Sequence, residues 1–151
     1  MLVPAVESDW EAIRRLSVQI HDLHAAWRPD IYCHSDAPYP KAAFLEDVHC
    51  NRLYVYRIDG KAAGYVVLMD MEKSGPGVVA HRLLRIDSIC VDESLRGQGI
   101  GSAMMEDVFR LAKERGYSNL FLGVHPENDK ALAFYKKYGF DVRTVNMQKK
   151  L

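Results

Sequence analysis

The sequence predicts a single α/β domain over residues 1–151, with a central, mostly antiparallel mixed sheet between flanking helices. Three observations support this prediction. A chain of 151 residues is long enough for one domain with one hydrophobic core. Two apolar stretches flank Asp59-Gly60, a dipeptide that is typical of tight β-hairpin turns. A glycine-rich loop at 96–101 follows a strand-like segment and opens a helix-like one, as in a strand–helix–strand unit with parallel strands.

The first fifty residues are expected to be mostly helical. The predicted elements are, in order, a short strand over 2–6, a helix over 8–27, a loop over 28–40 and a short helix over 41–49. The long helix is indicated by apolar residues at helical spacing, which are Trp10, Ile13, Leu16, Ile20 and Leu23. Ser8, with Glu11 three residues later, predicts a capping box at the N-terminus of this helix.

The middle of the chain predicts an antiparallel meander. Strands are expected over 52–58, 62–72 and 78–91. The first two are joined by the Asp59-Gly60 turn, and the last two by a turn over 73–77 that contains glycine and proline. Sequential strands joined by such tight turns pair in antiparallel fashion.

The architecture is expected to change after Val91. A helix should run from the glycine loop to Gly116, because apolar residues share one of its faces. These residues are Ile100, Met104, Val108, Leu111 and Ala112. The remaining predicted elements are a strand over 119–124, a helix over 127–139 capped by Glu127 or Asn128, and one or two closing strands over 140–151. The strand over 119–124 should lie parallel to the strand that precedes the glycine loop.

The composition argues against several function classes. Lysine plus arginine and aspartate plus glutamate each number 20, so no overall charge indicates a nucleic-acid partner. No apolar run reaches the length of a membrane span, and the first residues lack the pattern of a secretion signal, so no membrane partner is expected. The 3 cysteines are too few for a disulfide framework and favour a reducing, cytoplasmic location.

The loop from Arg96 to Gly101, with the sequence RGQGIG, places its glycines directly before the predicted helix. Glycine lets a ligand approach the backbone closely, and the N–H groups of a helix N-terminus attract phosphate. The loop lacks the Lys-Ser/Thr pair of a P-loop, and its glycine spacing differs from that of a dinucleotide-binding fingerprint. From these residues alone, a cradle for another phosphate-bearing ligand and a plain turn that binds nothing both remain open.

The segment from Arg96 to Phe140 resembles the GNAT family of N-acetyltransferases. The family's pyrophosphate loop, Gln/Arg-x-x-Gly-x-Gly/Ala, is matched by Arg96, Gly99 and Gly101. Downstream, the family shows Leu-x-Val, Asn-x-x-Ala, a tyrosine and a Gly-Phe pair. These are matched in order by Leu122, Val124, Asn128, Ala131, Tyr135, Gly139 and Phe140. The resemblance covers the C-terminal half of the chain.

This resemblance implies acetyl-coenzyme A (acetyl-CoA) as cosubstrate. In the family the pyrophosphate lies on the backbone amides of the glycine loop, which in this chain belong to Arg96, Gly97, Gln98, Gly99, Ile100, Gly101 and Ser102. The pantetheine arm runs along the preceding strand, so Ile89, Cys90 and Val91 are expected to line it, although a buried core strand fits them equally. Cys90 is expected to be a packing residue and not a nucleophile. The cofactor-binding core is then 86–140, and residues 1–50 form the acceptor side.

Direct transfer to an amine needs a base, an acid and a donor for the developing negative charge, for which a backbone N–H of the preceding strand is suited. Tyr135 matches the family position of the acid, and it also fits a core aromatic residue. Asp87 stands where many family members have a glutamate base. Because aspartate is one methylene shorter, a water relay, or a role in holding the acceptor amine, stays open for it, and His125 is the rival base. Asp87 fits equally a solvated carboxylate paired with Arg85 or Arg82, and His125 an exposed loop residue.

Two further matched positions concern the cofactor. Asn128 fits the family's helper role, in which the side chain contacts coenzyme A or an ordered water. It also fits a plain helix N-cap. Ala131 follows in the same motif, and the resemblance places it at the cofactor together with Tyr135.

The acceptor implied by the resemblance is an amine of a small molecule or peptide. Candidate groups to attract an ammonium are Asp30, Asp36 and Glu46, and candidate wall residues are Trp27, Tyr32 and Tyr39. A capping loop over the sheet is the plainer interpretation of this region.

A metal site is not expected, although histidines and cysteines gather in the first fifty residues. His21 and His24 share a helix face, and further ligand types occur at Cys33, His34, His49 and Cys50. Their spacing matches no zinc pattern.

Two functions remain open from the sequence. One is an N-acetyltransferase, and the other is a non-catalytic acyl-CoA-binding module that senses the cofactor or regulates a partner. Tyr135 and the candidate bases favour the enzyme. The family resemblance also makes a homodimer an expectation.

Overall fold

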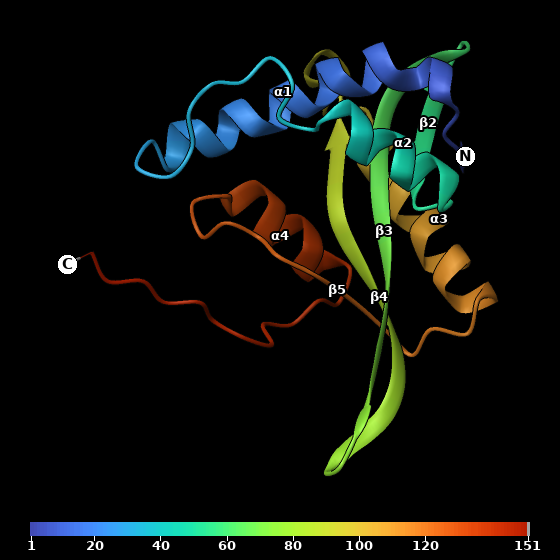
Figure 1. Ribbon diagram of the computed structural model, residues 1–151, viewed down its shortest axis with the longest axis vertical. Helices are drawn as coiled ribbons and strands as arrows, with labels where there is room; N and C mark the ends of the chain where they lie inside the picture. The colour runs from blue at the N-terminus through green and yellow to red at the C-terminus, as the bar shows by residue number, and fades with distance from the viewer. Residues whose placement is uncertain (151) are drawn as a thin grey trace.

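The computed structural model describes residues 1–150 (Figure 1). In chain order its strands and helices are β1 (Leu2–Pro4), α1 (Trp10–Trp27), α2 (Lys41–His49), β2 (Leu53–Ile58), β3 (Lys61–Gly75), β4 (Val78–Val91), α3 (Ile100–Glu114), β5 (Asn119–Leu122) and α4 (Asp129–Lys137). Short 3₁₀ turns occur at Glu7–Asp9 and Glu93–Leu95. Among the helices in this part of the chain, none combines the length and apolarity needed to cross a membrane.

The strands form one mixed sheet in the order β1-β2-β3-β4-β5. The pairs from β1 to β4 are antiparallel, whereas β4 and β5 are parallel. Asp59 and Gly60 connect β2 and β3 with φ angles of 49° and 77°, the left-handed conformation that a type I′ hairpin turn requires. The predicted α/β fold, with its antiparallel meander and its parallel pair, is therefore confirmed.

Helices cover both faces of the sheet (Figure 1). On one face, α1 and α2 bury Ile13, Leu16 and Phe44 against β2 and β3. On the other face, α3 buries Met104 and Val108 against β3 and β4. Each helix thus turns its apolar stripe to the sheet. The middle of α1 contacts the end of β4, where the Cys90 Sγ lies 3.4 Å from the Leu16 C=O, and the glycine loop leads from there into α3.

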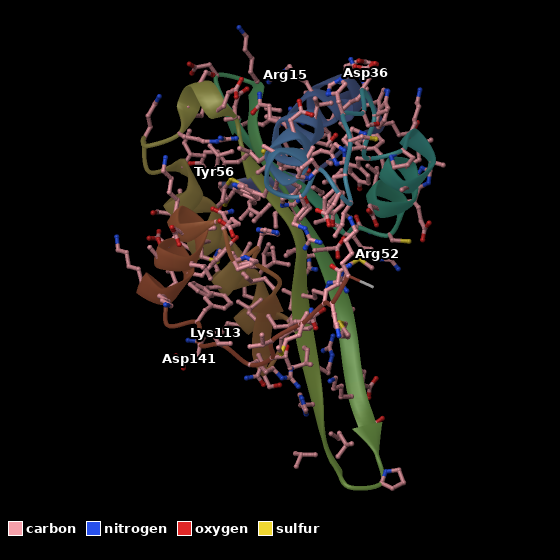
Figure 2. The ribbon with its side chains drawn as sticks, turned by 90° about the vertical axis from the view of Figure 1, so that its left-hand side faces the viewer. Arg15, Asp36, Arg52, Tyr56, Lys113 and Asp141 are labelled. Carbon is pink, nitrogen blue, oxygen red and sulfur yellow. The ribbon has the colours of Figure 1, made fainter. Side chains whose placement is uncertain are left out.

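β3 and β4 continue as a two-stranded ribbon beyond the body of the molecule (Figure 2). Their pairing extends to Gly75 opposite Val78. The turn predicted over 73–77 therefore contains only Pro76 and Gly77, because two residues suffice to reverse an antiparallel chain.

The start of α1 differs from the prediction. The chain forms a 3₁₀ turn over Glu7–Asp9 before α1 begins at Trp10, so Ser8 does not cap the α-helix, and β1 ends early at Pro4. The Asp9 carboxylate accepts the Val6 N–H (2.9 Å) and two hydrogen bonds from Arg57 (2.7 and 2.8 Å). A carboxylate held by an arginine is a stronger acceptor for a free N–H than a serine hydroxyl.

The prediction of closing strands over 140–151 is wrong for residues 140–150, the part of this range that the structure describes. Residues 140–150 form no helix or strand, and 141–150 are exposed. Figure 1 shows this segment running away from the body. Its β-branched residues favour a strand, but a strand forms only where a neighbour pairs with it. Leu151 lies outside the described residues.

Candidate active site

A cleft opens where β4 and β5 diverge. β5 pairs with β4 only from Asn119 opposite Leu83 to Leu122 opposite Ile86, whereas β4 continues to Val91. On the side of β4 where β5 has diverged, backbone groups of the last residues of β4 therefore face the cleft and not a neighbouring strand. A cavity of about 370 Å³ lies there, between the strand ends, α1 and α4.

Asp87 lies at an irregularity of β4. Its neighbours Ser88 and Ile86 pair with successive residues of β3, so Asp87 is the extra residue of a β-bulge. Bulges re-aim side chains and are frequent beside active sites. The Asp87 carboxylate lines the cavity and pairs with Arg85, one of the two partners that the sequence suggests.

The structure brings together the three predicted catalytic side chains, since Tyr135, Asp87 and His125 all line this cavity. Three of the predicted cofactor contacts also line it, namely Ile89, Asn128 and Ala131. The Asn128 side chain caps α4, because its Oδ1 accepts the Ala131 N–H (3.1 Å). These residues come from β4, from the loop after β5 and from α4.

Tyr135 packs its ring against Phe134 and Phe140, with centroids 5.4 and 5.6 Å away. Burial raises the pKa of its hydroxyl to about 12. The phenol is therefore protonated at neutral pH and available as a hydrogen-bond donor. A donor this weakly acidic stabilises a departing anion by hydrogen bonding more than by giving up its proton.

His125 is constrained by two contacts. Its ring stacks on Trp27 (centroids 5.3 Å apart), and its Nδ1 accepts the Glu127 N–H (3.2 Å). An imidazole nitrogen that accepts a backbone N–H must itself be unprotonated, so the proton of the neutral ring lies on Nε2. The remaining ring nitrogen is then a donor, which disfavours His125 as the base.

His24 is a functional candidate that the sequence analysis considered only as a metal ligand. It lines the same cavity, next to His21 and His125. Burial, with the nearby His125 and His21, lowers the pKa of His24 below its usual value. His24 is therefore neutral at neutral pH and able to accept a proton. Its position on α1 gave no sequence signal for this role, because its cavity neighbour His125 is distant in the chain.

Two tyrosines form an ordered wall on the acceptor side. Tyr39 and Tyr65 stack with centroids 6.5 Å apart, and both line the cavity. The Tyr39 hydroxyl donates to Asp47 (2.6 Å), and Tyr65 shares a hydrogen bond with Ser88 (3.0 Å). Burial raises the pKa of both phenols above the usual tyrosine value. Their hydroxyl groups are thus engaged, and the rings offer apolar surface.

The acidic residues suggested for attracting an ammonium do not line the cavity. Asp30 pairs with Arg28, Asp36 with His34 and Glu46 with Arg52, all on the surface. The carboxylates of the cavity are Asp47 and Asp87. Of the suggested wall residues, Tyr39 lines the cavity, Trp27 stacks on His125, and Tyr32 packs against His21 and His24. Across residues 1–150, no group of three histidine, cysteine or acidic side chains is close enough to hold a metal ion.

The glycine loop forms an open start to α3. Gly99 is the N-cap with a φ of 81°, and a Cβ built on Gly97 or Gly99 would meet no atom within 4 Å. The first backbone bond of α3 runs from the Ala103 N–H to the Gly99 C=O (3.0 Å), so the N–H groups of 100–102 lie ahead of the helical bonding pattern. Free N–H groups, the positive end of the helix dipole and an uncovered glycine backbone together fit an anionic ligand.

Asp92 anchors the approach to this loop. Its carboxylate accepts from the Ser94 N–H and hydroxyl (3.1 and 2.8 Å) and from Arg15 of α1 (2.6 Å). Burial opposes ionisation of Asp92, but the hydrogen bonds from Arg15 and Ser94 prevail and lower its pKa to about 2. The Arg96 Nε donates to the Val91 C=O (3.1 Å), so the loop is fastened to the end of β4 on both sides.

Cys90 and Val91 do not line the cavity with their side chains. Cys90 is buried beneath α1, where its Sγ lies 3.4 Å from the Leu16 C=O. Burial raises the pKa of its thiol to about 11, so the thiolate nucleophile is absent at neutral pH. Val91 packs on the opposite core, beside Gly101 of α3. The core-strand interpretation therefore holds for these two side chains. The Cys90 backbone pairs with Tyr65 of β3, so of the two residues only Val91 directs its backbone groups to the open side of β4.

Solved structures share the fold of this chain. The F44R mutant of the BH1408 protein from Bacillus halodurans superposes with a TM-score of 0.95 and 26% identity, covering 100% of this chain and 99% of that one. An aminoglycoside N-acetyltransferase solved with CoA superposes with a TM-score of 0.71 over the full length of both chains. At 17% identity, the second similarity concerns the fold alone.

Sequence relatives agree with the fold. The L-amino acid N-acetyltransferase AaaT of Escherichia coli is 26% identical over 140 residues, which cover 89% of this chain and 78% of that enzyme. An uncharacterized N-acetyltransferase of Methanocaldococcus jannaschii is 33% identical over 97 residues, which cover 61% of this chain but only 40% of the archaeal protein. Residues 17–140 match the Acetyltransferase (GNAT) family. The chain therefore belongs to the GNAT family of acetyltransferases and is an N-acetyltransferase.

Proposed function

We propose that this enzyme transfers an acetyl group from acetyl-CoA to a primary amine of a small molecule or peptide, by direct attack of the amine. The observation that carries this proposal is the cavity at the divergence of β4 and β5. It joins exposed backbone groups of β4 to a phenol donor, Tyr135, and to a neutral imidazole, His24. These are the groups that acyl transfer to an amine requires.

The residues present fit coenzyme A. The amides of 97–102 provide unpaired donors for the pyrophosphate, and the cleft-facing backbone groups of Ile89 and Val91 are suited to pair with the pantetheine arm. When bound, acetyl-CoA supplies an acetyl thioester. A backbone N–H of β4 beside the bulge at Asp87 is placed to donate to the carbonyl oxygen of that thioester.

We infer that His24 takes the proton that the acceptor must lose, because an ammonium has no lone pair for attack. Asp87 is paired with Arg85, and Nδ1 of His125 is occupied by a backbone N–H. His24 is half-buried and kept neutral by its surroundings. Asp87 and Asp47 contribute negative charge that attracts the ammonium before it is deprotonated.

Tyr135 acts on the leaving group in this account. Its hydroxyl is protonated, and α4 holds the ring at the cavity between the two aromatic neighbours. Donation to the sulfur stabilises the thiolate as it leaves.

The acceptor is proposed to be compact. The cavity volume of about 370 Å³ must hold the reactive end of the cofactor together with the acceptor. The Escherichia coli relative named above acts on L-amino acids, so single amino acids and short peptides are the first compounds to test.

Release of free thiol from acetyl-CoA tests this function directly. The purified protein is incubated with acetyl-CoA and, in turn, amino acids, N-terminal peptides, polyamines, amino sugars and aminoglycosides. Cys33 and Cys50 are exposed and contribute background thiol, which a reaction without amine subtracts. The proposal expects amine-dependent release with at least one class. Tight cofactor binding without amine-dependent release would instead support the acyl-CoA-binding module.

A further inference from the structure

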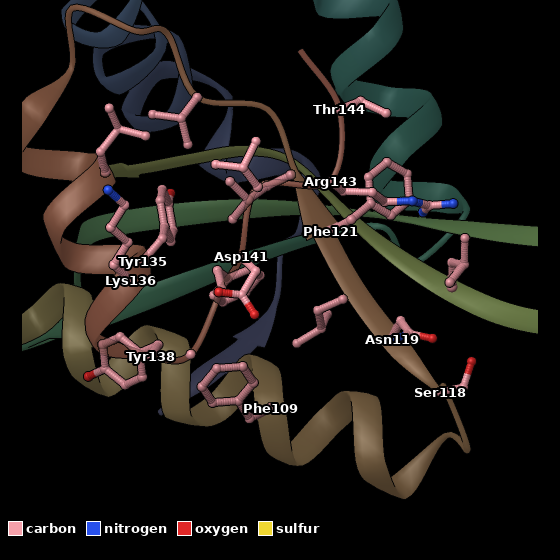
Figure 3. Close-up of a pocket in the computed structure, with 18 of the residues that line it drawn as sticks. Phe109, Ser118, Asn119, Phe121, Tyr135, Lys136, Tyr138, Asp141, Arg143 and Thr144 are labelled. Carbon is pink, nitrogen blue, oxygen red and sulfur yellow. The ribbon is translucent and has the colours of Figure 1, made fainter.

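The charged side chains that line the active-site cavity are of one sign. Two carboxylates line it, those of Asp47 and Asp87. Among the described residues around the cavity, none is a lysine or an arginine. Tyr135 also borders a separate groove along β5, and there Lys136 and Arg143 are among the lining residues (Figure 3). The cavity is therefore anionic, and a cationic ligand complements it.

Each carboxylate has an arginine partner outside the cavity but keeps free acceptor capacity. Asp87 pairs with Arg85, which is exposed. Arg52 lies 3.6 Å from Asp47, beyond hydrogen-bond distance, and also pairs with Glu46 on the surface. A carboxylate offers about four lone-pair sites, and ion pairs with exposed arginines contribute little. Both carboxylates of the cavity therefore remain able to bind an ammonium.

A pair of tyrosines separates the two carboxylates. Asp87 directly precedes Ser88 of β4, and the Ser88 hydroxyl shares a hydrogen bond with Tyr65 of β3 (3.0 Å). Tyr39 stacks on Tyr65 and donates its hydroxyl to Asp47 of α2 (2.6 Å). The tyrosine hydroxyls are thus engaged, and the rings provide an apolar wall between the two charges. Methylene groups pack well on such a wall, and the rings attract a nearby ammonium.

The strand order gives the separation of the two acidic residues. The Asp47 C=O accepts the Arg52 N–H (2.8 Å), which places Asp47 at the start of β2. Leu68 of β3 donates to the Arg52 C=O (2.8 Å) and pairs with Ile86, the neighbour of Asp87 on β4. The two residues therefore lie at one level of the sheet, two strand spacings or about 10 Å apart. Hydrogen bonds of about 2.8 Å to an ammonium at each end leave a gap that a short methylene chain spans.

We propose that the acceptor of this enzyme is an amine with a second cationic group, such as a short aliphatic diamine. This inference rests on the proposed function and narrows its acceptor class. The reacting amine lies at Asp87, beside the β4 backbone assigned to the thioester. The second ammonium lies at Asp47, and the methylene chain between them crosses the rings of Tyr39 and Tyr65.

A carboxylate on the acceptor is disfavoured by the same arrangement. An α-amino acid that places its amine at Asp87 also brings its own carboxylate close to Asp87, and like charges repel. His24 is neutral and supplies no cation, and the part of the chain that the structure describes brings no lysine or arginine to the cavity. Amino acids without a cationic side chain should therefore be poor acceptors.

Three amines of equal chain length isolate the effect of the second charge. They are 1,4-diaminobutane, butylamine and 4-aminobutanoate. We expect kcat/KM for 1,4-diaminobutane to exceed that for butylamine at least about tenfold, as a hydrogen bond to a charged group allows. This exceeds the statistical advantage of two equivalent amines. The value for 4-aminobutanoate should be lower still. Calorimetry with coenzyme A in place of acetyl-CoA should give the same order of affinities without turnover.

Asp47→Asn tests the source of the preference. Asparagine keeps an acceptor for the Tyr39 hydroxyl but removes the charge, so the preference for 1,4-diaminobutane over butylamine should fall close to its statistical value. Glu46→Gln is the matched control, because Glu46 is also paired with Arg52 but does not line the cavity. This variant should retain the full preference.

The outcomes separate this inference from the proposed function. Equal values for the three amines, or a preference for butylamine or 4-aminobutanoate, would reject a dicationic acceptor and leave acetyl transfer intact. A diamine preference that survives Asp47→Asn, or that is lost equally in Glu46→Gln, would remove Asp47 as its source. Neither binding nor transfer with any of the three amines would also reject the inference. The expected order of affinities without thiol release would support the inference and contradict the transfer reaction.

Discussion

The two ends of the active-site cleft are built from different parts of the polypeptide. The end assigned to the cofactor consists of backbone, namely the amides of the glycine loop and the outer edge of β4. The end assigned to the acceptor consists of side chains, with His24 from α1, Tyr39 from the following loop, and Asp87 from the bulge in β4. A backbone site requires small residues close together in the chain, so it leaves a contiguous motif. A side-chain site depends on how distant elements meet.

Tyr135 lies where the cofactor end and the acceptor end of the cleft meet, so removal of its hydroxyl should have the largest effect on kcat. Tyr135→Phe keeps the ring and its packing but removes the donor. We expect kcat to fall about 100-fold with little change in either KM. Steady-state kinetics with both substrates varied measures this. Tyr138→Phe, on the neighbouring turn and packed against Phe109 and Phe134, is the control and should retain activity. Equal activity of both variants would remove Tyr135 from the mechanism.

The glycine loop allows the cofactor end to be perturbed alone. Gly99→Ala places a Cβ on a left-handed residue at the proposed pyrophosphate site. We expect the KM for acetyl-CoA to rise about tenfold, because weakening one or two amide contacts costs on the order of 1.4 kcal/mol. The KM for the amine should change little.

Gly60→Ala is a matched control for this variant. Gly60 has a φ of 77° and open surroundings, like Gly99, but it lies in the turn after β2. Both variants should lose about 1–2 kcal/mol of stability from backbone strain. Only Gly99→Ala should raise the KM for acetyl-CoA. A similar rise in KM for both would mean that the strain, and not the lost site, explains the effect.

The acceptor end is tested by pH. The pKa of His24 lies below its usual value, so the imidazole is neutral at pH 7 and becomes protonated as the pH falls through that lowered pKa. As a base it should make kcat/KM fall on acidification. His24→Gln should lower kcat/KM about tenfold at pH 7 and displace this acid limb.

His34→Gln is the control for the histidine experiment. His34 is exposed and bonds Asp22 and Asp36, which raise its pKa. Its removal should leave the pH profile unchanged. An acid limb that persists unchanged in His24→Gln would assign proton removal to Asp87 or to water.

The smallest expected effect concerns the anchor of the loop. The pKa of Asp92 is lowered to about 2 from an ordinary value of 3.8, so its contribution to stability is present above about pH 4 and is lost as the pH falls towards 2. Asp92→Asn should therefore lose less stability than the unmodified protein between these pH values. Urea midpoints at pH 4 and pH 2.5 measure the difference, with exposed Asp141→Asn as control. An equal loss of stability between the two pH values in the unmodified protein, Asp92→Asn and Asp141→Asn would contradict the anchoring role of Asp92.

Features that follow from local sequence patterns are predicted well. The fold, the hairpin at Asp59-Gly60 and the open loop before α3 follow from local patterns of glycine and apolar residues. Tyr135, Asp87 and His125 lie in one cavity. The family motif carries the position of Tyr135, whereas Asp87 lies on the strand before the glycine loop and His125 directly follows the predicted strand over 119–124. Their roles stay proposals.

The remaining features depend on contacts between distant segments. His24 is kept neutral by burial and by His125, about a hundred residues away in the chain, so no local pattern marks it. The start of α1 is set by Arg57, which binds Asp9. The strand predicted at the end of the chain fails because a strand needs a partner, and no strand pairs with the described residues 140–150.

Amide NMR during titration with coenzyme A tests the central claim, that the glycine loop binds the pyrophosphate. Pantetheine, which lacks the pyrophosphate, is titrated in parallel. We expect coenzyme A to shift the amide signals of Gly97 to Ser102 and of β4 near Ile89, whereas pantetheine should shift only those near Ile89. Shifts at 97–102 that are the same with both compounds, or absent with coenzyme A, would contradict it.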